Sequence, residues 1–124
     1  MKKLCVVLIV LILALVISTA DSTISVKEYK EKVATPSDAI ASQQLNIYIG
    51  GITTGFLQAN LELQRMKSPM LYCQPDNFTI NMKNAVEILH QEISLWEEVV
   101  PKAFSEMSIS WVLLKGLIKT FPCK

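Results

Sequence analysis

The feature that most constrains the fold is a pair of cysteines, Cys73 and Cys123, that bracket two segments with helical periodicity. Apolar residues in both segments recur at steps of three and four, which is the spacing of one helix face. The first segment carries Met82, Val86, Leu89, Ile93, Trp96 and Val100. The second carries Phe104, Met107, Trp111, Leu114, Ile118 and Phe121, with a second apolar face of Ile109, Leu113 and Leu117. The sequence therefore predicts two long helices between the cysteines.

The ends of these helices are predicted from their flanking residues. Thr79 is expected to cap the first helix, and Pro101 to begin the second after a turn at 97–101. Each helix of about 20 residues would be roughly 30 Å long. Because only a short turn joins them, we expect an antiparallel hairpin, with the second helix as the buried centre. Such a hairpin brings Cys73 close to Cys123.

The N-terminus has the pattern of a secretory signal peptide. Lys2 and Lys3 precede an apolar run over 4–17, and the small residues Ser18-Thr19-Ala20 follow it. A membrane-spanning helix needs about 20 apolar residues, so this run is short for one. We expect cleavage after Ala20, which divides the chain into a signal peptide, 1–20, and one domain, 21–124. An uncleaved N-terminal anchor is the alternative.

Removal of the signal changes what the composition implies. The remaining chain has 10 basic and 11 acidic residues, which gives a net charge of −1 and no basic footprint for nucleic acid. Cys5 leaves with the signal, so an even pair of cysteines enters an oxidising compartment. We expect a Cys73–Cys123 disulfide, with two free thiols as the alternative. Closing this loop is worth about 4 kcal/mol by chain entropy.

Two further helices are predicted before the first cysteine. Ser25 and Glu28 fit a capping box for a helix with Val26, Tyr29 and Val33 on one side, which ends at Pro36. A longer helix starts near Thr35 as cap, with Pro36 and Asp38 in its first turn. Its stripe is Ala41, Leu45, Ile49, Ile52, Phe56, Ala59, Leu63 and Met66. The predicted fold is all-α: a small bundle of about four helices with a disulfide-closed C-terminal hairpin.

Three glycines, Gly50, Gly51 and Gly55, interrupt the long helix. Each costs about 1 kcal/mol relative to alanine. They predict close helix–helix packing or a kink there; the alternative is a close-contact surface for a partner. The pattern disfavours a phosphate-binding loop, because no strand is predicted before the glycines and no Lys-Ser/Thr pair follows them.

The residues give little sign of catalysis. His90 is the single histidine and is expected at the surface or its boundary, without the partners that a metal site or a catalytic triad needs. Glu97 and Glu98 are adjacent and are expected to form a solvated tip at the turn. Trp96 and Trp111 could line a ligand pocket, but both fall on core stripes. We predict a protein that is not an enzyme and needs no metal or other cofactor.

Three short motifs resemble a known family. They are Tyr48-Ile49-Gly50-Gly51 in the long helix, Cys73-Gln74-Pro75 followed by Thr79, and the terminal Phe121-Pro122-Cys123. In order and spacing they resemble the Rap/Tai family of type VI secretion amidase-immunity proteins, over about 41–123. The chain differs from many members in having Gln43-Gln44-Leu45-Asn46 where they carry further cysteines, and Thr53-Thr54 where an acidic residue often follows the glycine.

This resemblance implies a small, exported, helical protein of the bacterial periplasm that binds and blocks a peptidoglycan-cleaving amidase. The implied partner is therefore a protein, the amidase effector. We take as contact candidates the acidic tip, Glu97 and Glu98, and the loop residues Met70, Leu71 and Tyr72. Leu71 and Tyr72 could instead be core residues beside the disulfide.

Two further interpretations stay open. The chain could be a small periplasmic stress chaperone or a structural envelope protein, because acid-stress chaperones are also small, helical and exported with a single disulfide. The two apolar faces of the last helix also leave room for a homodimer.

Overall fold

The computed structural model describes residues 23–35 and 38–124, and over these residues the chain is all-α, as expected. The helices are α2 (Val26–Ala34), α3 (Ala39–Arg65), α4 (Met82–Val99), α5 (Pro101–Phe104) and α6 (Ile109–Thr120). None of the helices in this part is long and apolar enough to span a membrane. The predicted signal peptide, its cleavage site, Cys5 and Pro36 lie outside the described residues.

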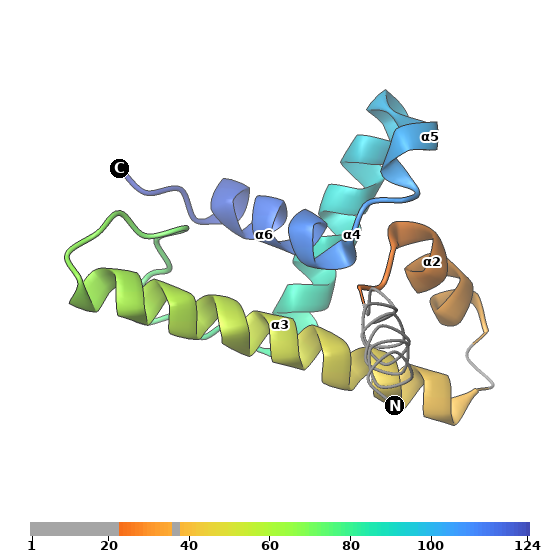
Figure 1. Cartoon of the computed structure of the whole chain (residues 1–124), viewed down its shortest axis with the longest axis horizontal. Coiled ribbons are helices and arrows are strands. Elements are labelled where there is room, and N and C mark those ends of the chain that lie inside the picture. The colour runs from red at the N-terminus through yellow and green to blue at the C-terminus, as the bar shows by residue number, and fades with distance from the viewer. Residues whose placement is uncertain (1–22, 36–37) are drawn as a thin grey trace, which may run out of the picture.

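The helices surround one core. The long α3 lies along one side of the molecule and α6 along the other, and α4 connects the two sides (Figure 1). Side chains from every described helix and from the loop before α4 fill the centre; those with the least exposure include Val26, Ile49, Tyr72, Leu89, Phe104, Ile109 and Leu113. The core is therefore shared by segments from all parts of the described chain.

The short helix α2 begins at the predicted capping box. Ser25 accepts a hydrogen bond from the Glu28 backbone, and the Glu28 carboxylate accepts one from the Ser25 N–H at 2.9 Å. The hydrogen bonds that the Ser25 N–H and hydroxyl donate to the carboxylate hold the pKa of the Glu28 carboxyl below its ordinary value. Val26 and Tyr29 are buried as expected, but Val33 is 46% exposed, because α2 packs only by its first turns.

A backbone contact that sequence periodicity does not reveal fixes the start of α2. The Val26 N–H donates to Met107 O at 2.8 Å, and the Ile109 N–H donates to Ile24 O at 2.9 Å. Ser25 and Ser108 thereby form an isolated antiparallel bridge. The segment before α2 is docked into the connection between α5 and α6.

Helix α3 starts later than predicted, and its stripe shifts along its length. Asp38, not Thr35, is the cap: its carboxylate accepts hydrogen bonds from the Ile40 and Ala41 N–H groups. Leu45 and Ile49 are buried as expected. Ala59 and Met66 are exposed instead, and Thr53 and Asn60 take the inner positions. Both are polar, which is why an apolar pattern does not find them.

The C-terminal hairpin is present, but its second arm is divided. Helix α4 is capped by Asn81 in a reciprocal pair with Asn84, not by Thr79. The predicted continuous helix from Pro101 breaks after Phe104, and α6 starts again at the cap Ser108. The break lies where residues 105–109 bond to the segment before α2, so their N–H and C=O groups serve a long-range contact.

The face of α6 that was predicted as its second apolar face is the one that is buried in the core. Ile109, Leu113 and Leu117 are fully buried, whereas Trp111 and Ile118 are each 37% exposed. Gly116 explains the choice of face, because a Cβ on it would lie 2.6 Å from Ile88 Cγ2 of α4. The face that contains Gly116 can therefore approach α4 more closely than the face that contains Trp111.

Of the three glycines in α3, only Gly50 lies at a close helix–helix contact of the predicted kind. A Cβ on Gly50 would lie 3.1 Å from Met82 Cε, a tight contact with α4. A Cβ on Gly51 or Gly55 would meet nothing within 4 Å. These two glycines are exposed, so close packing within the described residues does not explain them.

Candidate partner-contact site

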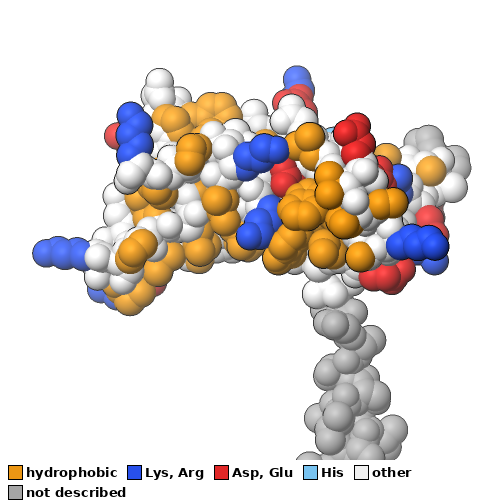
Figure 2. All heavy atoms as spheres, turned by 90° about the horizontal axis from the view of Figure 1, so that it is seen from above, with side chains coloured by type: hydrophobic (Ala, Val, Ile, Leu, Met, Phe, Trp, Pro, Cys, Tyr) orange, Lys and Arg blue, Asp and Glu red, His pale blue; other side chains and the backbone are white. Residues whose placement is uncertain are grey.

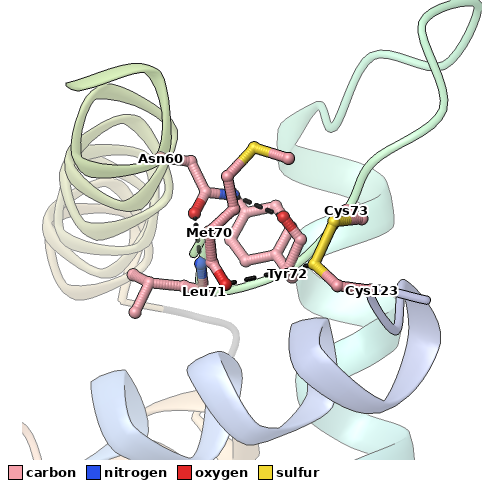
Figure 3. Close-up of a disulfide and its surroundings, with 6 residues drawn as sticks. All are labelled: Asn60, Met70, Leu71, Tyr72, Cys73 and Cys123. Atoms are coloured by element: carbon pink, nitrogen blue, oxygen red, sulfur yellow. Dashed lines mark hydrogen bonds between the residues drawn. A yellow bond between two sulfur atoms is a disulfide. The ribbon is translucent and has the colours of Figure 1, made fainter. Parts of the chain in front are cut away.

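The loop between α3 and α4 is held by one buried side chain, Asn60. Its Oδ1 accepts from the Leu71 N–H at 2.8 Å, and its Nδ2 donates to Tyr72 O at 2.8 Å (Figure 3). Asn60 is 6% exposed, so both bonds are shielded from water. One amide therefore satisfies two loop backbone groups and fixes the loop against α3.

The other side of the loop is joined to the C-terminus by the predicted disulfide. The Cys73–Cys123 bond is present, with the Cα atoms 4.8 Å apart. The Cys73 N–H also donates to Phe121 O at 2.8 Å. The Phe121 ring lies near two loop rings, with its centroid 5.4 Å from that of Phe78 and 6.5 Å from that of Tyr72. The loop is thus fastened on both sides, to α3 and to the segment after α6.

The three loop candidates differ in their accessibility. Tyr72 is 1% exposed, so the core alternative applies to it. Burial raises the pKa of its hydroxyl. Met70 is partly buried, and Leu71 is 37% exposed although it is apolar. Of the three candidates, Leu71 and Met70 are the side chains that a partner can reach.

The acidic pair lies in the last turn of α4, not in a turn between helices. Glu97 Oε1 accepts from Lys30 Nζ of α2 at 2.6 Å, so this carboxylate is already paired. Glu98 is exposed. A carboxylate at a helix C-terminus is electrostatically unfavourable, and Lys30 offsets this for Glu97. Glu98 is the member of the pair that faces solvent.

A surface groove of about 400 Å³ lies between α2 and α4, next to Glu97. At its wall the buried Tyr29 hydroxyl and His90 Nε2 are 2.5 Å apart. Burial raises the pKa of Tyr29 to about 12, so the phenol keeps its proton at neutral pH, and its hydroxyl is hydrogen-bonded to Nε2. His90 is exposed at this boundary, as its place in the sequence indicated. The pair fastens α2 to α4.

The structure does not bring the two candidate surfaces together. The loop precedes α4, a helix of 18 residues and about 27 Å, and Glu98 lies in the last turn of that helix. A contact centred on one surface would meet the other only at its margin. The loop and the tip are therefore separate candidates.

Sequence patterns missed two polar residues that position these elements, Asn60 and Glu92. The Glu92 side chain is buried on the face of α4 toward α6; it accepts from Trp96 Nε1 at 2.7 Å and lies 3.7 Å from Lys119 Nζ. Helical periodicity places both residues on the inner faces of their helices. This spacing is the one sequence signal that could have identified them as buried. Only the three-dimensional partners explain why they are polar.

The described residues contain no group of three or more histidine, cysteine or acidic side chains that could hold a metal ion. Comparisons with protein-family models, curated proteins and solved structures give no significant match. The described residues offer a loop fixed on two sides, a groove and an exposed acidic helix end.

Proposed function

We propose that this chain is a periplasmic immunity protein of the Rap/Tai type, which binds a type VI secretion peptidoglycan amidase and occludes its active site. The observation that carries the proposal is that Cys73-Gln74-Pro75 and Phe121-Pro122-Cys123, 50 residues apart, are joined by a disulfide. Two of the motifs behind the resemblance thus form one structural unit on a helical scaffold. No catalytic residue of its own is needed for this role.

The loop residues Met70 and Leu71 are the proposed occluding contact. A segment that enters a cleft loses less entropy on binding when its shape is already fixed. The Asn60 amide and the Cys73–Cys123 bond fix this loop on two sides. Leu71 would then present an apolar side chain to the cleft, with Met70 at its edge. Glu98 is the second candidate contact, at the far end of α4.

The test begins with the oxidised chain as bait in periplasmic extracts and in lysates of competitor strains. We expect retention of a peptidoglycan amidase at near-stoichiometric yield. Its hydrolysis of peptidoglycan is then measured with added wild-type chain, Leu71→Asp, Glu98→Lys and the control Glu87→Lys, which changes an exposed residue of α4. Loss of a central apolar contact should weaken inhibition about tenfold or more for Leu71→Asp.

Each other outcome has a definite meaning. Loss of inhibition in Glu98→Lys alone would move the contact to the end of α4. Retention of many unrelated unfolded proteins, with an apolar dye binding to the chain in acid, would replace the proposal with a stress chaperone. An amidase that is retained but fully active would exclude occlusion.

A further inference from the structure

Two buried polar atoms of the loop between α3 and α4 find no hydrogen-bond partner within the described chain: the Tyr72 hydroxyl and Gln74 Oε1. The Tyr72 side chain is 1% exposed. The Gln74 amide is oriented by its other end, because Nε2 donates to Phe78 O and Oε1 is thereby left as an acceptor. Buried polar atoms in folded proteins nearly always make a hydrogen bond. These two therefore point to a group that binds beside them.

The two side chains line the same pocket, which lies between the second half of α3 and the loop. Its volume is about 200 Å³. A smaller hollow of about 60 Å³ shares Tyr72 and Gln74 with it. The exposed Asp76 also lines the pocket, and the walls are apolar side chains from both elements: Leu57, Leu61, Met70 and Pro75. The pocket thus combines a hydrocarbon wall with a few polar groups.

The polar groups of the pocket favour a ligand that donates hydrogen bonds and is positively charged. Its described lining includes no lysine or arginine. The Asp76 carboxylate takes part in none of the ion pairs of the described residues. The Asn60 amide also lines the pocket, but both of its ends are used by the loop backbone. The Tyr72 hydroxyl, Gln74 Oε1 and Asp76 remain as three acceptors.

We propose that this pocket binds an alkylammonium group on an apolar stem, as in a lysine side chain. An ammonium has three N–H donors and no acceptor, which matches the three acceptors of the pocket. Its hydrocarbon stem would lie along the apolar walls. Sites for drug-sized ligands measure about 300–1,000 Å³, so a pocket of about 200 Å³ suits a single side chain. This inference goes beyond the proposed immunity function and does not depend on it.

Recognition of the ammonium depends on these local contacts and not on the field of the whole molecule. Lysine and acidic side chains are scattered among apolar ones on the face seen from above in Figure 2. The formal net charge of the full sequence is only +1. A molecule with mixed charges and a small net charge attracts cations weakly at long range. Changes to the pocket itself should therefore decide whether the ammonium binds.

The test is an NMR titration of the purified oxidised chain with n-butylamine near pH 7, where the amine is charged as lysine is. We expect saturable shifts of the Tyr72 ring and the Gln74 side-chain amide in the millimolar range. n-Butanol has the same stem without the charge and should bind about tenfold more weakly or less. Nα-acetyl-lysine N-methylamide carries the same ammonium within a short peptide. Tighter binding of this compound than of n-butylamine would assign the site to a lysine of a protein partner, and equal binding to alkylammonium groups in general.

Two variants remove one acceptor each. Asp76→Asn and Tyr72→Phe should each weaken n-butylamine binding several-fold. Tyr72→Phe removes only an unpartnered hydroxyl, so its urea midpoint should not fall below that of the wild type. Glu31→Gln is the control: it removes an exposed carboxylate of α2 that does not line the pocket, and it should bind as the wild type does. An absence of saturable shifts with both amines, equal binding of n-butanol, or unchanged binding in both pocket variants would overturn the proposal.

Discussion

Gly116 sets the distance between α6 and α4, and this gives the first prediction. Gly116→Ala should lower the free energy of unfolding by about 1–3 kcal/mol, because the new methyl group would overlap Ile88 Cγ2 and the core would have to shift. Urea unfolding measures the change. Gly55→Ala is the control, because a Cβ on Gly55 would meet nothing within 4 Å. The better helix propensity of alanine should then raise the free energy of unfolding by up to about 1 kcal/mol. Equal effects of the two variants would contradict the packing argument.

Tyr29 makes the stability of the chain depend on alkaline pH. Its pKa is raised from 10.0 to about 12 in the folded protein, so the folded state holds the phenol proton more tightly than the unfolded state does. The contribution is complete below pH 10 and is lost as the pH rises from 10 towards 12. Stability should therefore fall with pH across this window.

Tyr29→Phe isolates this contribution from that of Tyr72, whose pKa is raised in the same direction. The variant should be less stable at pH 8 by about 1 kcal/mol, because the hydrogen bond to His90 is lost. The difference from the wild type should then shrink above pH 10. Urea titrations at several pH values measure it, and a difference that stays constant would show that the hydroxyl titrates normally in the folded state.

At the scale of elements, the loop between α3 and α4 depends on a single amide. Asn60→Ala should cost about 1–3 kcal/mol, because it leaves the Leu71 N–H and the Tyr72 C=O without their buried partner. Hydrogen exchange at the Leu71 amide should accelerate far more than exchange in α4. Gln64→Ala, an exposed change one turn later on α3, should leave both properties unchanged. Slow exchange at Leu71 in Asn60→Ala would mean that the disulfide alone fixes the loop.

The existence of most elements could be predicted from local pattern, because capping and apolar spacing act within a few residues of sequence. The Ser25–Glu28 box and the existence of α3 and α4 are examples, although Asp38 and Asn81 cap these two helices rather than Thr35 and Thr79. The break between α5 and α6 could not, because its cause is the pairing of residues 105–109 with the segment before α2. A local pattern also could not rank the two faces of α6, since the decisive clash distance involves Gly116 and Ile88 on different helices.

The candidate site was predictable to a lesser degree. The Cys73–Cys123 pairing followed from two hairpin arms with a cysteine outside each, and the structure confirms it. The accessibility of the contact candidates did not follow. Tyr72 turns inward beside Phe121, and Glu97 pairs with Lys30 of a helix 67 residues earlier. Burial and ion pairing of this kind depend on which helices meet, which periodicity alone does not specify.

At the scale of the whole molecule, the disulfide connects the loop before α4 to the end of α6, so it closes most of the C-terminal half. The cysteines are 50 residues apart, and cross-linking a loop of this length restricts the unfolded chain by about 4 kcal/mol. This is a large fraction of the roughly 5–15 kcal/mol of an ordinary domain. The reduced chain should therefore unfold at much lower urea concentration than the oxidised chain.

The measurement compares urea unfolding of the oxidised wild type, the reduced wild type and the double variant Cys73→Ser/Cys123→Ser. We expect the last two to agree, because both lose the cross-link and keep the Cys73 N–H to Phe121 carbonyl hydrogen bond, which uses backbone atoms. An unchanged urea midpoint on reduction would show that the cross-link does not restrict the unfolded chain as the loop-entropy argument requires. If the reduced chain also loses inhibition of an amidase while α3 and α4 remain helical, the disulfide acts on the contact loop itself.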